Sequence, residues 1–255
     1  MIDCHSHIIP NIDDGAESVE MAMEMLKQSA KHGVTDIIST SHCYPRYAQS
    51  IDHFLEKRTN GFEMLKDAIK ESNIDVPRIH LGSEVNMITD IAEFNHISKL
   101  CIEDTSYILI EMPYTPWKEW MFDSVYRLTL MGLKPIMAHI DRFLFQDKAL
   151  LDTLFELDVL YQVNAELFLA KNVSKFANDL LTSGHAHLLG TDMHNLSDRK
   201  TTMDAVYENI MKRYGQGCID YFNENARCVL NDEPISNFYF KMPEKRSFFS
   251  KLFKK

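Results

Sequence analysis

Short apolar runs alternate strictly with longer segments of helical periodicity, and this alternation constrains the fold more than any other feature. The runs predict seven strands, at residues 1–5, 36–40, 79–84, 107–111, 135–139, 159–164 and 187–191. Between them, apolar residues recur three or four positions apart, as in Val19, Met23 and Leu26. Strands that alternate with helices form parallel sheets with helical crossovers. Seven such units predict an α/β fold, a closed or nearly closed TIM-like (β/α)7 barrel.

Residues 1–240 are predicted to form one domain, and residues 241–255 a separate basic tail. No linker, low-complexity run or charge block interrupts the first 230 residues. The tail, KMPEKRSFFSKLFKK, holds six Lys or Arg against one Glu, with Phe and Leu interleaved. Two interpretations stay open: a solvated disordered tail, or a short amphipathic helix that meets anionic lipid or an acidic partner.

Composition excludes several classes of protein. A formal charge of −10 argues against a nucleic-acid binder, because phosphate backbones are held mainly by Lys and Arg clusters. No run approaches the ~18 apolar residues of a transmembrane helix, and the acidic, His-rich start is unlike a signal peptide. These features predict a cytoplasmic protein. The five cysteines form no CxxC pair and are odd in number, which predicts free thiols.

The first strand carries a possible chelate. His5 and His7 are two residues apart and project to the same side of an extended strand. Imidazole is the commonest metal ligand among side chains, so the pair offers two ligands at once. The alternative is a pair of exposed polar residues near a fraying terminus. The acidic turn Asp13-Asp14-Gly15 follows closely, and Asp14 is equally plausible as a turn residue.

Polar side chains follow the other predicted strands at their carboxyl ends, where the loops of parallel barrels build active sites. In chain order these strand ends give His5 and His7, His42, Glu84, Glu111, His139, Asn164, and Asp192 with His194. The set mixes nitrogen and oxygen ligands and is too large for one tetrahedral zinc. It predicts a multinuclear site for Mn, Fe or Zn. Metals ~3.5–4 Å apart lower the pKa of bound water toward ~7, so the predicted reaction is metal-assisted hydrolysis.

Position along the strand separates these residues from other histidines. His185 and His187 repeat the opening spacing, but they precede the seventh strand and are predicted to be structural, at the opposite end of the barrel. The remaining histidines lie in helices or at strand starts and are predicted to face solvent or bond locally: His32, His53, His80 and His96. Cys4 is expected to point away from His5, and Cys43 to pack rather than ligate.

Two arginines predict the class of substrate. Arg142 comes three residues after His139, and Arg199 five residues after His194. A guanidinium pairs bidentately with phosphate oxygens and stabilises charge in the transition state. Either arginine alone reads equally well as a surface residue. Two of them on loops that carry ligands favour a phosphoester.

Several separated motifs together resemble the PHP (polymerase and histidinol phosphatase) superfamily, and within it the bacterial manganese-dependent tyrosine phosphatases of capsule and exopolysaccharide gene clusters. The resemblance runs from about residue 2 to 230. It rests on Asp3-Cys-His-Ser-His7, Asp13-Asp-Gly15, Ser39-Thr-Ser-His42, Gly82-Ser-Glu84, Leu109-Ile-Glu111, Ala138-His-Ile-Asp-Arg142, Gln162-Val-Asn164 and Gly190-Thr-Asp-Met-His-Asn195. It implies a distorted (β/α)7 barrel with a trinuclear centre, Mn²⁺ first, with Fe or Zn as alternatives. The implied substrate is the Tyr-rich tail of a bacterial tyrosine kinase.

The resemblance also implies a ligand set. One metal would take His5, His7, Glu84 and Asp192; a second would share Glu84 and add Glu111 and His139; the third would take Asp14, His42 and His194. Asp14 becomes a ligand through the resemblance alone. Arg142 and Arg199 match the phosphate-contacting arginines of the family. A phenolate leaving group, with a pKa of ~10, makes a modest demand on a general acid, and the sequence identifies none.

Alternative activities remain. Histidinol phosphatases of the superfamily keep the metals but commonly have a different first loop, whereas residues 7–15 here are close to the tyrosine phosphatase pattern. Residues 43–50 and 114–120 depart in detail and should rim the pocket, so the resemblance leaves the peptide preference open. A Cys43 nucleophile is disfavoured, because position 49, where such a loop needs Arg, is Gln and the nearest arginine is Arg46. A non-catalytic binding scaffold would be expected to have lost ligands, and all nine are present.

Overall fold

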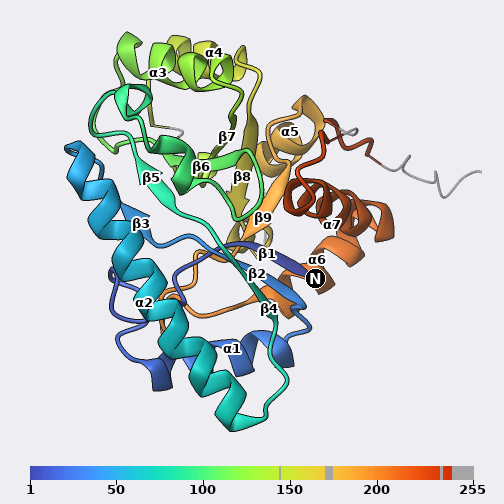
Figure 1. The fold of residues 1–255 in the computed structure, drawn as a ribbon. Helices are drawn as coiled ribbons and strands as arrows, with labels where there is room; N and C mark the ends of the chain where they lie inside the picture. Colours follow the sequence, from blue (N-terminus) through green and yellow to red (C-terminus); the bar gives the residue numbers. More distant parts are fainter. Residues whose placement is uncertain (144, 170–174, 236–237, 243–255) are drawn as a thin grey trace, which may run out of the picture.

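The computed structural model describes residues 1–143, 145–169, 175–235 and 238–242, which form nine strands with helices outside them (Figure 1). All strand pairs are parallel. The strands are β1 Ile2–Ser6, β2 Asp36–Ser39, β3 His42–Cys43, β4 Arg78–Leu81, β5 Glu84–Asn86, β6 Tyr107–Glu111, β7 Lys134–Met137, β8 Leu160–Asn164 and β9 Leu188–Gly190.

Helices connect most of the strands, as the periodicity predicts, with β2 to β3 and β4 to β5 as the exceptions. The α-helices are α1 Val19–Lys31, α2 Ala48–Ser72, α3 Glu119–Leu130, α4 Lys148–Phe155, α5 Lys175–Ser183, α6 Met203–Tyr214 and α7 Gln216–Leu230. Four short 3₁₀ helices complete the described part: η1 Ile91–Glu93, η2 Ile97–Leu100, η3 Ile140–Phe143 and η4 Ala165–Phe168. Helix α1 is capped by the Ser18 hydroxyl, which accepts from the Met21 amide, and it is followed by Gly33 at φ 79°.

The strands form two sheets, with orders β1-β2-β4 and β3-β5-β6-β7-β8-β9. Strands β2 and β3 are separated by two residues, as are β4 and β5, so the chain passes directly from one sheet to the other. Next to β9, an isolated parallel bridge pairs Ser6 with Met193. The fold is therefore of the predicted α/β class with a parallel half-barrel sheet, and its sheets are divided rather than forming one ladder.

Two predicted strands are interrupted, which is the main departure from the sequence expectation. The strand predicted at 36–40 ends at Ser39, because the Thr40 hydroxyl accepts the Ser6 amide in place of a backbone carbonyl. The strand predicted at 79–84 stops at Leu81, and Glu84 begins a new one. At the break, Gly82 packs tightly: a Cβ there would lie 3.3 Å from Ile38 Cγ2. The fifth predicted strand also ends early, at Met137, so His139 lies beyond it.

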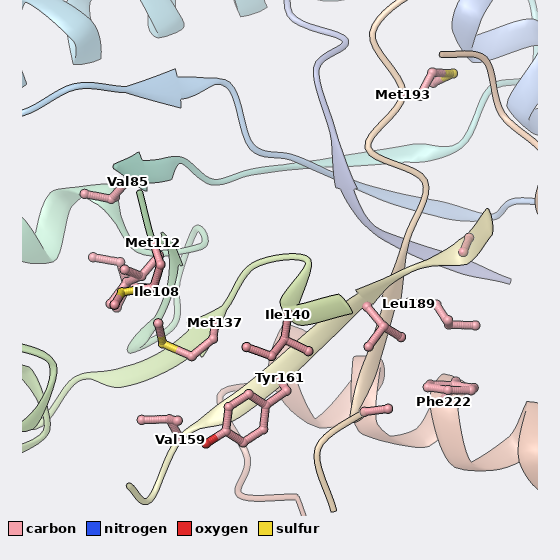
Figure 2. Close-up of a cluster of buried hydrophobic side chains, with 14 of the residues drawn as sticks. Val85, Ile108, Met112, Met137, Ile140, Val159, Tyr161, Leu189, Met193 and Phe222 are labelled. Atoms are coloured by element: carbon pink, nitrogen blue, oxygen red, sulfur yellow. The ribbon is translucent and has the colours of Figure 1, made fainter. Parts of the chain in front are cut away.

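Apolar residues cover both faces of the strands, as buried parallel strands require. In β6 the buried residues Ile108 and Ile110 belong to the large cluster under the helices, whereas Leu109 belongs to a second cluster with Ile136. Figure 2 shows members of the large cluster, among them Leu189 of β9 and Phe222 of α7. The core therefore holds the strands from both faces, and this packing keeps the polar residues at the strand ends in fixed positions.

The structure confirms the prediction for most histidines away from the strand ends. His32, His80 and His96 lie 2.6, 3.1 and 3.0 Å from Asp204, Asp36 and Asp52, and His53 is exposed. His187 is buried at the start of β9, where its Nδ1 accepts the Tyr161 amide at 3.0 Å.

The cysteines match the prediction as well, and the basic tail lies mostly outside the described residues. Each of the five thiols is free. Of the tail 241–255, the structure describes the first two residues. No helix in the described ranges combines the length and apolar character needed to span a bilayer.

Candidate metal centre

The structure brings the nine predicted ligand residues together on the carboxyl side of β1, β2, β4, β6, β7 and β9. They come from β1 and the loop after it, the starts of β3 and β5, the end of β6, and the segments after β7 and β9: His5, His7, Asp14, His42, Glu84, Glu111, His139, Asp192 and His194. Seven of these residues are buried. The exceptions are His42, whose side chain is 13% exposed, and Asp14, which is 65% exposed and opens the cluster to solvent on one side.

His5 and His7 both direct Nε2 toward the carboxylates of Glu84 and Asp192. The Gln162 Oε1 atom lies 3.1 Å from His5 Nδ1, and Asp13 Oδ2 lies 2.7 Å from His7 Nδ1, so both acceptors fix the proton on Nδ1. The two Nε2 atoms then face each other at 3.1 Å. Each also lies 3.3 to 3.5 Å from carboxylate oxygens of Glu84 and Asp192. Lone pairs of two imidazoles and two carboxylates thus converge on one point.

Three overlapping groups of ligand atoms are compact enough to hold metal ions, with all atoms of a group within 4.8 Å of one another. They are His5, His7 and Glu84; His42, Glu84 and Glu111; and His7, Asp14, His42 and His194. His139 adjoins the second group, with its Nε2 2.7 Å from Glu84 Oε1 and 3.8 Å from Glu111 Oε1. Glu84 lies at the centre of the arrangement, next to His5 and His7 as well.

Several buried atoms of the cluster lack hydrogen-bond partners among the described residues, which is the signature of a site that fits metal. His42 Nδ1 and Glu84 Oε2 lie 2.9 Å apart without hydrogen-bond geometry, and His194 Nε2 is also unpartnered. Leaving such groups buried and unpaired costs free energy. Divalent cations satisfy the same atoms, and the mixed imidazole and carboxylate set suits Mn, Fe or Zn.

The electrostatics of the cluster favour positive charge. Burial alone would lower the pKa of His7, but hydrogen bonds with Asp13, Asp192 and Glu84 raise it well above its usual range. Burial would raise the pKa of Glu84, but the charge of His5 and the hydrogen bond from His139 hold it well below its usual range. The Glu84 carboxylate is therefore ionised, and it stabilises a cation at this point.

Backbone geometry at the cluster is unusual in two ways. His139 and Asp192 have positive φ angles, 31° and 53°, a left-handed conformation that is costly for residues other than glycine. In addition, two glycines allow close approach to the β1 histidines. A Cβ on Gly15 would lie 2.5 Å from His7 Cβ, and one on Gly190 would lie 2.3 Å from His5 Cβ. The surrounding fold holds these positions against local preference.

Residue type and spacing do not predict the roles of two residues that position the candidate ligands. Asp13 lies beside the predicted ligand Asp14, but its Oδ2 accepts from His7 Nδ1 and from the His42 amide, both at 2.7 Å. Gln162 Oε1 serves His5 and also accepts the His139 amide at 2.7 Å. Nothing in the sequence distinguishes Asp13 from Asp14. For Gln162 the one signal in the sequence is its place in the predicted strand, two residues before the end and on the same side as Asn164.

The two predicted arginines meet at Asp192. Arg142 and Arg199 each donate from Nη2 to Asp192 Oδ2, the latter at 2.7 Å, while Asp192 Oδ1 faces the β1 histidines. With the Asn164 amide oriented so that its oxygen faces Arg142, it accepts from Nε at 2.8 Å and from Nη2 at 3.0 Å. The guanidinium groups therefore lie at the edge of the cluster, and Asn164, a predicted strand-end residue, holds one of them.

The cysteines near the cluster do not take part in it. Cys4 packs in an apolar cluster with Ile2 and Ile38, away from His5, as predicted. Cys43 is buried, and burial raises the pKa of its thiol to about 12. A nucleophilic cysteine needs the opposite, a lowered pKa that gives thiolate at neutral pH. The structure supports the expectation that Cys43 is a packing residue.

Comparisons with known proteins find tyrosine-protein phosphatases among the relatives of this chain. The chain is 29% identical to the tyrosine-protein phosphatase CpsB of Streptococcus pneumoniae over 247 residues, 92% of this chain and 100% of that protein. It is 29% identical to the tyrosine-protein phosphatase YwqE of Bacillus subtilis over 251 residues, 92% of this chain and 93% of that protein.

Solved structures and family profiles extend the comparison. Crystal structures described as YwqE and CpsB, unique metal-dependent tyrosine phosphatases, include one that matches with a TM-score of 0.76 at 23% identity, over 92% of this chain and 96% of that one; this likeness shows a shared fold. The profile of the family described as capsular polysaccharide synthesis, CpsB/CapC, matches residues 1–231. The chain therefore belongs to the CpsB/CapC family, in agreement with the resemblance drawn from its motifs.

Proposed function

We propose that this chain is a metal-dependent protein-tyrosine phosphatase that acts on the tyrosine-rich tail of a bacterial tyrosine kinase controlling capsular or exopolysaccharide synthesis. The observation that carries the proposal is the meeting of Arg142 and Arg199 at Asp192, on the edge of a cluster of metal-type ligands. Metal-assisted hydrolysis of a phosphomonoester uses both parts, a metal centre that activates water and cations that neutralise the phosphoryl oxygens. The names of CpsB and YwqE support the tyrosine specificity.

The ligand sets follow the resemblance, with Mn²⁺ as the expected metal and Fe or Zn as alternatives. His5, His7, Glu84 and Asp192 would hold one ion; Glu84, Glu111 and His139 a second; Asp14, His42 and His194 the third. The convergence of lone pairs on Glu84 supports the sharing of that carboxylate between two ions. Gln162 and Asp13 would keep the β1 rings in the tautomer that presents Nε2.

Metals bound there would lower the pKa of water and supply the nucleophile. The chain's own contribution is to orient and neutralise the phosphoryl group. Arg142 and Arg199 are always charged, and their fixed donor geometry matches phosphoryl oxygens. Their shared partner Asp192 and the Asn164 amide hold both guanidinium groups at the edge of the cluster before substrate arrives, so little reorganisation is needed.

The same proposal extends to architecture and location. We infer that the two sheets together form one distorted (β/α)7 barrel, supported by the Ser6 and Met193 bridge beside β9 and by the shared fold with the YwqE and CpsB structures. Residues 1–240 would be its single domain. A cytoplasmic location follows if the substrate is the intracellular tail of a kinase.

The deciding experiment measures hydrolysis of a phosphotyrosyl peptide before and after chelation, with and without added Mn²⁺. Chelation should abolish activity and Mn²⁺ restore it, and His5→Ala, Asp192→Ala and Arg142→Ala should each lower kcat at least a hundredfold while remaining folded. Arg78→Ala is the matched control, because that side chain is 78% exposed at the start of β4.

Three results would reject the proposal. Activity that survives complete chelation would rule out the metal mechanism. Preferential turnover of free histidinol phosphate over the phosphotyrosyl peptide would move the chain to the small-molecule phosphatases. A folded, metal-loaded protein that hydrolyses no phosphomonoester would make it a binding scaffold.

A further inference from the structure

Two exposed aromatic rings stand beside the arginine edge of the metal centre. Tyr114, in the loop after β6, is 54% exposed, and Phe145, after η3, is 61% exposed. Their rings are nearly parallel, with an interplanar angle of 6° and centroids 6.5 Å apart. Large exposed aromatic side chains lose hydrophobic free energy unless a ligand or partner covers them. This pair, called the aromatic wall below, is therefore a candidate contact surface.

Buried rings fix the aromatic wall relative to the metal centre. Phe143 is fully buried beneath it, with its centroid 5.4 Å from Tyr114 and 6.4 Å from Phe145. The same ring lies 5.4 Å from buried Trp117 and 5.7 Å from His139, one of the predicted ligands. The Phe143 ring thus lies between the aromatic wall and the metal centre, and its packing holds the wall in place.

A hydrogen bond joins the wall to the proposed phosphoryl site. The Tyr114 hydroxyl accepts from Arg142 Nη1 at 3.4 Å, and Arg142 also contacts Asp192. In phosphotyrosine a single bridging oxygen connects phosphorus to the ring, so a phosphoryl group at Arg142 brings that ring next to its neighbours. In phosphoserine the bridging oxygen is attached to a methylene group instead of a ring, so there is no ring face to pack.

We propose that Tyr114 and Phe145 form the surface on which the aromatic ring of a phosphotyrosyl substrate packs, so that the wall selects aryl over alkyl phosphomonoesters. The inference rests on the proposed function for the nature of the reaction, but the ring contact is a binding property that can be measured separately. Offset or edge-to-face packing against an aromatic partner is favourable beyond the area it buries.

The test uses phenylphosphonate and methylphosphonate, which the enzyme cannot hydrolyse, as probes of the metal-loaded protein by calorimetry. The wild type should bind phenylphosphonate more tightly. Phe145→Leu should weaken the binding of phenylphosphonate by about three- to tenfold, the factor expected for one aromatic contact. Its affinity for methylphosphonate should stay unchanged. Tyr114→Phe, which keeps the ring, should retain the preference, whereas Tyr114→Leu should reduce it.

Tyr126→Leu is the matched control, because Tyr126 on α3 is also 54% exposed, and it should change neither affinity. In parallel, Phe145→Leu should lower kcat/KM for a phosphotyrosyl peptide and leave the inhibition constant of inorganic phosphate unaltered. Equal affinities of the wild type for the two phosphonates would overturn the proposal, as would parallel losses of both in Phe145→Leu. A wild type that prefers phenylphosphonate but hydrolyses no phosphotyrosine would refute the proposed function and leave the wall standing.

Discussion

Asp13 shows how one residue beside a ligand controls it. Its carboxylate accepts from His7 Nδ1 and from the His42 amide, which ties together two of the predicted ligands. Asp13→Asn keeps the shape but replaces the charged acceptor with an amide, which holds the tautomer and orientation of His7 less firmly. Loss of such a partner typically weakens metal affinity by about 10–100-fold.

Titration of Mn²⁺ into the chelated protein should show that loss directly. Asp75→Asn, at an exposed position, is the control and should bind like the wild type. Unchanged Mn²⁺ affinity in Asp13→Asn would mean that the His7 ring is held by its packing alone.

At the residue scale, the sequence predicts candidate metal ligands more readily than the residues that position them. His5, Glu84 and Asp192 could be named because their types and their places at strand ends both point to metal ligation. Gln162 could not be assigned its role, because its hydrogen bonds to His5 and His139 depend on how three strands are brought together. Positive φ at His139 and Asp192 is equally invisible in the sequence.

Gly190 ends strand β9 where it packs against β1, and the absence of a side chain is what allows the approach. A Cβ there would lie 2.3 Å from His5 Cβ and 2.9 Å from Gln162 Nε2. Gly190→Ala should therefore lower the free energy of unfolding by about 1–3 kcal/mol, as overpacking does, and should also weaken metal binding by displacing His5.

Gly217 provides the contrast within the same chain. It lies in helix α7, and a Cβ added there would meet nothing within 4 Å. Gly217→Ala should raise the free energy of unfolding by about 0.4–1 kcal/mol, since it restricts the unfolded chain at no steric cost. Urea denaturation of both variants measures the two effects. Equal effects of the same sign would contradict the steric explanation.

His187 at the start of β9 makes stability depend on pH. Burial, with the nearby charge of His185, lowers its pKa to about 3, whereas in the unfolded chain the ring titrates near 6.5. Between these values the unfolded state binds the additional proton, so the contribution of His187 to stability is lost as the pH falls below 6.5. At pH 5 the loss from this ring approaches about 2 kcal/mol.

Replacing His187 by a residue that does not titrate isolates its pH-dependent contribution to stability. His187→Gln can still accept from the Tyr161 amide, and its free energy of unfolding should fall less than that of the wild type between pH 7.5 and 5. Denaturant melts at the two pH values measure the difference. Parallel losses in the two proteins would show that other groups account for the acid sensitivity.

At the element scale, the alternation of strands and helices was predictable because both periodicities are strong and local. The strand predicted at 159–164 corresponds to β8 and differs from it by one residue, and the strand predicted at 107–111 matches β6 at both ends. The breaks after Ser39 and Leu81 could not be predicted, because they depend on a hydroxyl replacing a backbone acceptor and on close packing at Gly82. Those breaks matter for the site, since His42 and Glu84 begin the new strands.

For the molecule as a whole, the junction between β1 and the segment after β9 lies outside the regular strand ladders. It is held by a bridge between Ser6 and Met193, with backbone bonds of 2.8 Å from the Asp192 amide to His5 and from the His7 amide to Met193. Predicted ligands lie on both sides of it. Metal binding should therefore tie β1 to the segment after β9, in addition to its chemical role.

Hydrogen exchange with and without Mn²⁺ tests this coupling. A ligand that binds the folded state alone stabilises it by about 2.7 kcal/mol at a hundredfold excess over its Kd. If the metals clamp the junction, the amides of His7 and Asp192 should gain protection beyond the rise shared by the whole protein, whereas Ile108 in central β6 should gain the shared rise alone. Asp192→Asn should abolish the extra protection at His7. Uniform protection in the wild type would mean that the junction is already closed and that the metals stabilise the fold without tightening it.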